Sequence, residues 1–162
     1  MPDSGYWICV IASPLAMWSM RSRMWSGVVM RIICDTHIPL FWANAPSRLS
    51  VSAAAALEKG RQEGQLAIAD ISLWELALLI DRGRLQLPGD VSPVDYLSRL
   101  LQALRLQVLP ITADIAVLSR SSLFQHGDPA DRLIAATALH GGWPLITADE
   151  KLRALPDLHC IW

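Results

Sequence analysis

The chain has 162 residues, which is enough for one domain with a sizeable hydrophobic core. Hydrophobic residues make up 52% and charged residues 18% of the chain, a composition that excludes an intrinsically disordered protein. The formal net charge of −1 shows none of the basic surplus that usually accompanies nucleic-acid binding, although a bound divalent cation can supply positive charge locally.

The first segment of the chain differs in composition from the rest. It is rich in Trp and Met, and its charged residues are Asp3, Arg21 and Arg23. A signal peptide is disfavoured because both arginines follow the apolar run, and Ser and Pro interrupt that run too often for a membrane span. Met30 opens "MRIICDTH", a natural first strand. We therefore expect residues 1–29 to be an N-terminal extension, poorly ordered or a start-site artefact, and residues 30–162 to form the domain.

From Met30 onward, short apolar runs alternate with longer segments of helical periodicity. The pattern predicts strands at 31–34, 65–69, 106–111 and 144–147. It predicts helices at 51–64, 71–83, 94–104, 113–123 and about 129–140, with a short helix from Glu150 and a final segment, 158–162, left unassigned. This alternation indicates an α/β protein with a mostly parallel sheet. In such sheets, ligands bind outside the carboxyl ends of the strands.

Several acidic residues follow predicted strands or open predicted helices, and each has an ordinary structural explanation. Asp35 is a candidate helix N-cap, and Ser72-x-x-Glu75 and Thr147-x-x-Glu150 both match a capping box. The second box leaves Asp149 unexplained. Glu75 also lies in an otherwise apolar helix, where a carboxylate is costly unless it is paired or bound to a metal.

The segment "HGDPADRLIAATALHGGW" (126–143) carries two aspartates three residues apart. Asp128 followed by Pro129 is a near-ideal helix start, with Asp as the N-cap and Pro at the first helical position. Capping thus explains Asp128 completely. Asp131 is then the third helical residue, and we predict that it faces the functional edge of the sheet.

Taken together, Asp35, Glu75, Asp131 and Asp149 are expected to converge on one edge of the sheet. Crowded carboxylates repel one another unless a hard divalent cation lies among them. Oxygen ligands favour Mg²⁺ or Mn²⁺ over zinc, and the cysteines at 9, 34 and 160 are too scattered for a zinc site or a disulfide framework. We predict metal-assisted phosphodiester hydrolysis, with the four acids as catalytic metal ligands, in a reducing cytoplasmic setting.

Four segments in this order resemble the PIN-domain family, and most closely the VapC toxins of bacterial type II toxin–antitoxin pairs. They are "RIICDTH" (31–37), "ISLWELALL" (71–79), "HGDPADRLIAATAL" (126–139) and "LITADEKL" (145–152). The resemblance covers about residues 30–162. Family members often have an aromatic residue where this chain has Ala130, and the N-terminal extension is a larger departure.

The resemblance implies a three-layer α/β/α sandwich with a central, mostly parallel sheet. It also implies a Mg²⁺- or Mn²⁺-dependent endoribonuclease that acts as a toxin, is neutralised by a cognate antitoxin protein and forms a homodimer. The acidic quartet of the family falls on Asp35, Glu75, Asp131 and Asp149. Thr36 and Thr147 match the hydroxyl residues beside the first and last acids. The amphipathic helices at 51–64 and 94–104 offer an apolar groove for a partner helix.

Two other functions are compatible with an acidic residue after the first strand. A haloacid-dehalogenase-like phosphatase also has Asp after its first strand, but it requires a second Asp two positions later, where this chain has His37. The alternative is a catalytically inactive PIN-like module that only binds an antitoxin or RNA, and the presence of all four acids argues against it. Helical spacing with Leu78 favours a core position for Trp74 over a base-stacking platform.

Overall fold

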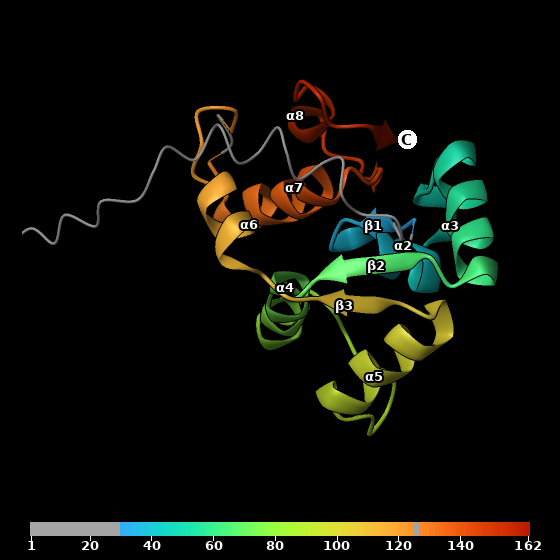
Figure 1. Cartoon of the computed structure of the whole chain (residues 1–162). Helices are drawn as coiled ribbons and strands as arrows, with labels where there is room; N and C mark the ends of the chain where they lie inside the picture. The colour runs from blue at the N-terminus through green and yellow to red at the C-terminus, as the bar shows by residue number, and fades with distance from the viewer. Residues whose placement is uncertain (1–29, 125–126) are drawn as a thin grey trace, which may run out of the picture.

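The computed structural model describes residues 30–124 and 127–162, so the prediction for residues 1–29 lies outside the described residues. A parallel sheet with the strand order β3-β2-β1-β4-β5 forms the centre of the molecule (Figure 1). Its strands are β1 (Ile32–Cys34), β2 (Leu66–Ala69), β3 (Gln107–Leu109), β4 (Leu145–Ile146) and β5 (Cys160–Ile161). The first four lie within the predicted ranges, and β5 occupies the segment left unassigned.

Helices cover both faces of this sheet. In chain order they are α2 (His37–Asn44), the short 3₁₀ helix η1 (Pro46–Arg48), α3 (Val51–Glu63), α4 (Ile71–Asp81), α5 (Pro93–Leu104), α6 (Ala113–Leu118), α7 (Pro129–Gly141) and α8 (Glu150–Arg153). Figure 1 shows α6, α7 and α8 on one side of the sheet and α5 on the other. The three-layer α/β/α architecture with a parallel sheet is therefore confirmed.

The two layers of helices are held by two separate apolar cores, because successive strand residues point to opposite faces. In β1, Ile33 packs in the core beneath α6, α7 and α8, whereas Cys34 packs in the core with α2, α3 and α5. The strands are buried on both faces, and all four residues of β2 are buried. This explains why the strands read as continuous apolar runs rather than as alternating patterns.

The helix boundaries follow local polar residues closely. Ser50 and Ser92 each accept a hydrogen bond from a backbone N–H as N-caps of α3 and α5, and Gly64 ends α3 in the left-handed region with φ of 66°. The prediction of one helix over 113–123 is wrong in its second half. Helix α6 ends at Leu118, where the Ser119 hydroxyl donates to the carbonyl of Ala116 at 2.7 Å and competes with further helical hydrogen bonds.

Helix α4 follows β2 at the carboxyl edge of the sheet and contacts all three apolar clusters. Ile71 contacts one core and Leu73 the other, while Leu76 packs with Leu40 of α2 and Leu100 of α5 in a third cluster. Helix α4 also contacts α7. This helix therefore bridges the layers where functional residues were expected. In the described part of the chain, no helix has the length and apolar character needed to cross a membrane.

Candidate active site

Polar side chains gather at the carboxyl edge of the sheet, as the parallel topology requires. Asp35 comes directly after β1, and Thr147 directly after β4, its neighbour in the sheet. The Thr147 hydroxyl donates to Asp35 Oδ2 at 2.6 Å although 112 residues separate them in the chain. The two strand ends thus form a single polar site.

Asp35 is held rigidly and is almost inaccessible to solvent, with 7% of its surface exposed. The backbone N–H of Thr36 donates to its second carboxylate oxygen, Oδ1, at 2.6 Å. Burial raises the pKa of the Asp35 carboxyl, while the Thr147 hydrogen bond, the charge of His37 and the Thr36 N–H oppose the rise. The nearby charge of Asp149 raises this pKa further. Burial and the charge of Asp149 therefore make the ionised form of Asp35 costly unless a positive charge lies close to it.

Glu75 joins the same site from α4 through a pair of buried hydroxyl groups. The Thr36 hydroxyl donates to Glu75 Oε2 at 2.5 Å, and its oxygen lies 3.0 Å from the hydroxyl oxygen of Ser72. A threonine hydroxyl has one hydrogen, so with Thr36 donating to the carboxylate, Ser72 is the donor to Thr36. Ser72 is fully buried and Thr36 is 1% exposed. These two hydroxyls form a relay that fixes the position of Glu75.

The pKa of Glu75 depends on its burial and on the charges of nearby carboxylates. Burial raises the pKa of the Glu75 carboxyl, and the Thr36 hydrogen bond partly offsets this rise. The charges of Asp35 and Asp128 raise the pKa further. Like charges that act on one another in a partly buried site are stabilised when a cation binds among them. Asp35, Glu75, Asp128 and Asp149 therefore belong to one electrostatic cluster.

Both capping-box interpretations are wrong, because the helices begin at other residues. The N-cap of α4 is Asp70, so Ser72 lies inside the helix, and Glu75 binds Thr36 rather than a backbone N–H. The N-cap of α8 is Asp149, whose Oδ1 accepts from the N–H groups of Lys151 and Leu152 at 2.8 and 2.9 Å. Asp149 thus has a structural role that the sequence did not indicate, in addition to its charge near Asp35.

The start of α7 is confirmed as predicted. Asp128 is the N-cap, its Oδ1 accepts from the N–H of Ala130 at 2.9 Å, and Pro129 occupies the first helical position. Asp131 lies in the first turn of α7 and is partly buried. Helix α7 thus brings Asp128 to the groove that Glu75 lines, whereas Asp131, one of the four predicted ligands, is not among the residues that line it.

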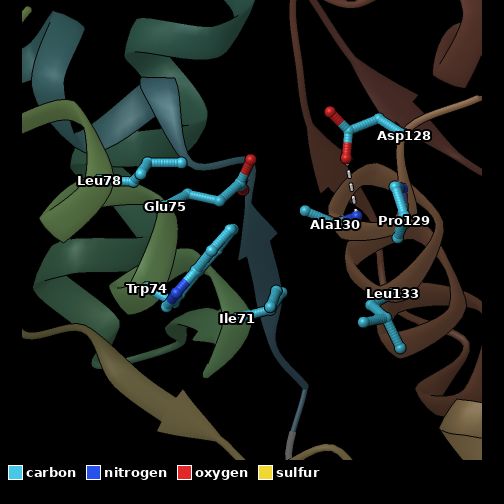
Figure 2. A pocket seen from close by; sticks show the side chains of 8 residues that line it. All are labelled: Ile71, Trp74, Glu75, Leu78, Asp128, Pro129, Ala130 and Leu133. Atoms are coloured by element: carbon cyan, nitrogen blue, oxygen red, sulfur yellow. Dashed lines mark hydrogen bonds between the residues drawn. The ribbon is translucent and has the colours of Figure 1, made fainter. Parts of the chain in front are cut away.

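A groove of about 510 Å³ separates α4 from α7 next to the carboxylates. Figure 2 shows the carboxylates of Glu75 and Asp128 on opposite walls near one end of the groove, with apolar side chains along the remainder. The lining consists of Ile71, Trp74, Glu75, Leu78, Asp128, Pro129, Ala130 and Leu133. Trp74 is 59% exposed, so its interpretation as a core residue is wrong.

The chemistry of the donor groups fits a hard divalent cation. Among residues 30–124 and 127–162, no three Asp, Glu, His or Cys side chains stand close enough together to form a preassembled metal cage. Mg²⁺ does not need such a cage, because it keeps several waters and usually binds one or two carboxylates together with phosphate oxygens of the substrate. The cluster offers only oxygen ligands, which suit Mg²⁺ or Mn²⁺ better than zinc.

The fold and this site define a PIN domain, and comparison with known proteins agrees. The chain belongs to the PIN-domain family, which matches residues 32–158. The relatives include ribonuclease VapC22 of Mycobacterium tuberculosis (strain ATCC 25618 / H37Rv). That protein is 40% identical over 124 residues, which cover 76% of this chain and 90% of the relative. The resemblance inferred from the four motifs is thereby confirmed.

Solved structures share the fold at lower sequence identity. VapBC2 from Rickettsia felis, bound to a DNA fragment from its promoter, has a TM-score of 0.62 and 22% identity, and the match covers 81% of this chain and 97% of that chain. A toxin–antitoxin complex from Klebsiella pneumoniae has a TM-score of 0.55 and 21% identity over 78% of this chain and 94% of that chain. These likenesses support the three-layer architecture.

Proposed function

We propose that this chain is a divalent-metal-dependent endoribonuclease that acts as the toxin of a toxin–antitoxin pair. The observation that carries the proposal is the arrangement around Asp35, which is buried at a strand end with both carboxylate oxygens fixed by hydrogen bonds. A 40% identical relative that is named a ribonuclease supports the same activity. RNA is accordingly the proposed substrate.

The proposed metal ligands are Asp35, Glu75, Asp131 and Asp149, with Mg²⁺ or Mn²⁺ as the cation. When bound, the cation polarises the phosphoryl oxygens and stabilises the charge that develops on the leaving oxygen. Thr147 and the Thr36 N–H hold the Asp35 carboxylate at a fixed angle. The Thr36–Ser72 relay holds Glu75 facing the same space. These residues therefore preorganise negative charge so that little reorganisation accompanies the reaction.

A cleavage assay with purified protein and structured RNAs tests this proposal. We expect internal cleavage in Mg²⁺ or Mn²⁺, none in EDTA, and recovery when either metal is added in excess. Cleavage that persists unchanged in EDTA after exhaustive dialysis would contradict the metal dependence. Absence of both cleavage and metal binding in a calorimetric titration would instead favour an inactive module that only binds an antitoxin or RNA.

A protein antitoxin, a homodimeric state and a cytoplasmic location complete the proposal. The complex from Klebsiella pneumoniae pairs a toxin with an antitoxin, and a partner of that kind is expected here. Induced expression of this chain should arrest growth, and co-expression of a small protein from the neighbouring gene should restore growth and co-purify with it. Light scattering of the isolated chain gives the oligomeric state, and a monomer at all concentrations would contradict the homodimer.

A further inference from the structure

Trp74 is the most unusual surface residue of the α4–α7 groove. It lies near the start of α4, which begins at Ile71, and 59% of its surface is exposed. Exposed aromatic rings forgo the large favourable free energy of burial, and Trp in particular is enriched where binding partners cover it. The residue after it is Glu75, which the hydroxyl relay fixes in the carboxylate cluster. An exposed indole therefore borders the proposed reaction centre.

The groove has two chemically distinct parts. At one end stand the carboxylates of Glu75 and Asp128, and along the remainder lie apolar side chains from both helices (Figure 2). Trp74 projects from α4 into this space, and Pro129 and Leu133 face it from α7. Apart from the two carboxylates and the indole N–H, the lining side chains have no hydrogen-bonding groups.

We propose that this groove is a nucleobase subsite, in which a base of the RNA next to the cleaved phosphate stacks on the indole ring of Trp74. The inference rests on the proposed ribonuclease function and extends it to a specific residue. A phosphodiester held through a cation at the proposed ligands, of which Glu75 lines the groove, carries a nucleoside on each side, and one of these nucleosides would cover the surface beside Glu75. A nucleotide also matches the groove in its chemistry, with a charged phosphate at one end and an apolar π-face at the other.

The lining also predicts what kind of recognition this subsite performs. Stacking on an aromatic side chain tolerates every base, because each base has a π-face. Readout of base identity needs hydrogen-bond donors and acceptors placed around the edge of the base, and the apolar part of the groove provides none from its side chains. Trp74 therefore contributes affinity and orientation, with at most a preference for the larger purines.

Two substitutions at Trp74 separate stacking from simple apolar contact. Trp74→Leu keeps an apolar side chain but removes the aromatic face, and Trp74→Phe keeps a smaller aromatic face. We expect Trp74→Leu to lower kcat/KM on a short RNA by roughly 5- to 150-fold, mostly through KM, which corresponds to the loss of one stacked base. Trp74→Phe should recover most of this loss. Val94→Ala, at a 73% exposed position on α5, is the control and should cleave like the wild type.

An RNA that lacks one base beside the cleavage site completes the test. Removal of the base should cost the wild type about the same factor as Trp74→Leu, and the two changes together should cost no more than either alone. Strictly additive losses, or a Trp74→Leu variant that cleaves like the wild type, would overturn the subsite. A Trp74→Leu variant that cleaves normally but escapes a neutralising protein partner would assign the groove to that partner and also overturn the proposal.

Binding measured without cleavage distinguishes this proposal from the proposed function. Fluorescence anisotropy of labelled RNA in Mg²⁺ gives the Kd for the wild type, Trp74→Leu and Trp74→Phe whether or not the chain cuts RNA. Weaker binding for Trp74→Leu alone supports the subsite even if no cleavage is found. Equal Kd values for all three proteins contradict the subsite even if the ribonuclease activity is confirmed.

Discussion

Two grooves in the surface of this domain have similar apolar linings but differ in what surrounds them. The α4–α7 groove has about 510 Å³ and the carboxylates of Glu75 and Asp128 in its wall. The α2–α5 groove has about 260 Å³ and is lined by Trp42, Tyr96, Arg99 and other residues of those helices and of the loop that precedes α5. Among the described residues that line this second groove, none is Asp or Glu.

The difference follows from where each groove lies relative to the sheet. The first lies at the carboxyl edge, where strand ends deliver Asp35 and Thr147 and where buried hydroxyls position Glu75. The second lies between helices, and its polar contact is an exposed hydrogen bond from Asn44 to the Tyr96 hydroxyl at 3.0 Å. A hollow with aromatic residues is thus common to both, whereas buried, mutually oriented carboxylates distinguish the proposed active site. The following predictions test this distinction, from the largest effect to the smallest.

The two aspartates of α7 should differ sharply in their effect on cleavage. Asp131→Asn removes a proposed metal ligand and should reduce cleavage by more than about 100-fold, the upper range for loss of an outer-shell partner. Asp128→Asn should retain most activity, because Asn caps a helix nearly as well as Asp and because Asp128, although it lines the groove with Glu75, is not a proposed metal ligand. Initial rates on one RNA at saturating Mn²⁺ measure both. Equal losses in the two variants would refute this division of roles.

Ser72→Ala tests whether the hydroxyl relay matters for the metal. The variant removes the donor to Thr36 and should weaken apparent Mn²⁺ affinity by about 10- to 100-fold, as is typical for outer-shell partners. Ser119→Ala is the matched control, because Ser119 is 4% exposed, donates a hydrogen bond in α6 and lies outside the carboxylate cluster. Both variants should lose on the order of 1 kcal/mol of stability. If both also bind Mn²⁺ like the wild type, the relay has no functional role.

The buried carboxyl of Asp35 should make the metal-free protein sensitive to pH. Burial is the main reason why the pKa of Asp35 is higher in the folded state than in the unfolded state. Below the unfolded pKa the carboxyl is protonated in both states, and the folded state does not have to bury a charge. This favourable situation is lost as pH rises through the folded pKa, because the buried carboxyl then ionises. In EDTA, Asp35→Asn should therefore gain in Tm relative to the wild type as pH increases from acid to neutral. Each kcal/mol corresponds to about 2–4 °C for a protein near this size. A difference in Tm that does not vary with pH would contradict this assignment.

Tyr96→Phe should have the smallest effect, because it changes the groove that lacks carboxylates. It removes the exposed hydrogen bond from Asn44, and the expected change in the free energy of unfolding is within about 0.5 kcal/mol. Cleavage and Mn²⁺ affinity should be unchanged. A loss of cleavage comparable to that of Asp131→Asn would show that the two grooves act together.

The sequence was sufficient to predict the sheet edge because strand ends and parallel topology leave few alternatives. Asp35 was placed correctly after the first strand, and Thr147, predicted as the last residue of the fourth strand, directly follows that strand in the structure. Side-chain partners were harder to predict. Ser72 and Glu75 matched a capping box at the right spacing, but α4 begins one residue before Ser72, and this places the serine beside Thr36 instead.

The exposure of Trp74 could not be predicted from periodicity either. Helical spacing correctly places Trp74 and Leu78 on one side of α4, where both line the groove. Spacing does not tell whether another element covers that side, because this depends on where α7 packs after a separation of more than fifty residues. The same limit applies to α6, which ends where the Ser119 hydroxyl binds a helix carbonyl and not where the apolar pattern fades.

The most direct test of the account is a comparison of RNA cleavage by the wild type and Asp35→Asn at saturating Mn²⁺. The amide can accept from the Thr36 N–H and donate to the Thr147 hydroxyl, so the variant should fold while its side chain lacks the negative charge. We predict metal-dependent cleavage by the wild type and none detectable by the folded variant. Wild-type cleavage rates in a folded Asp35→Asn protein would contradict the assignment of the sheet edge as the active site.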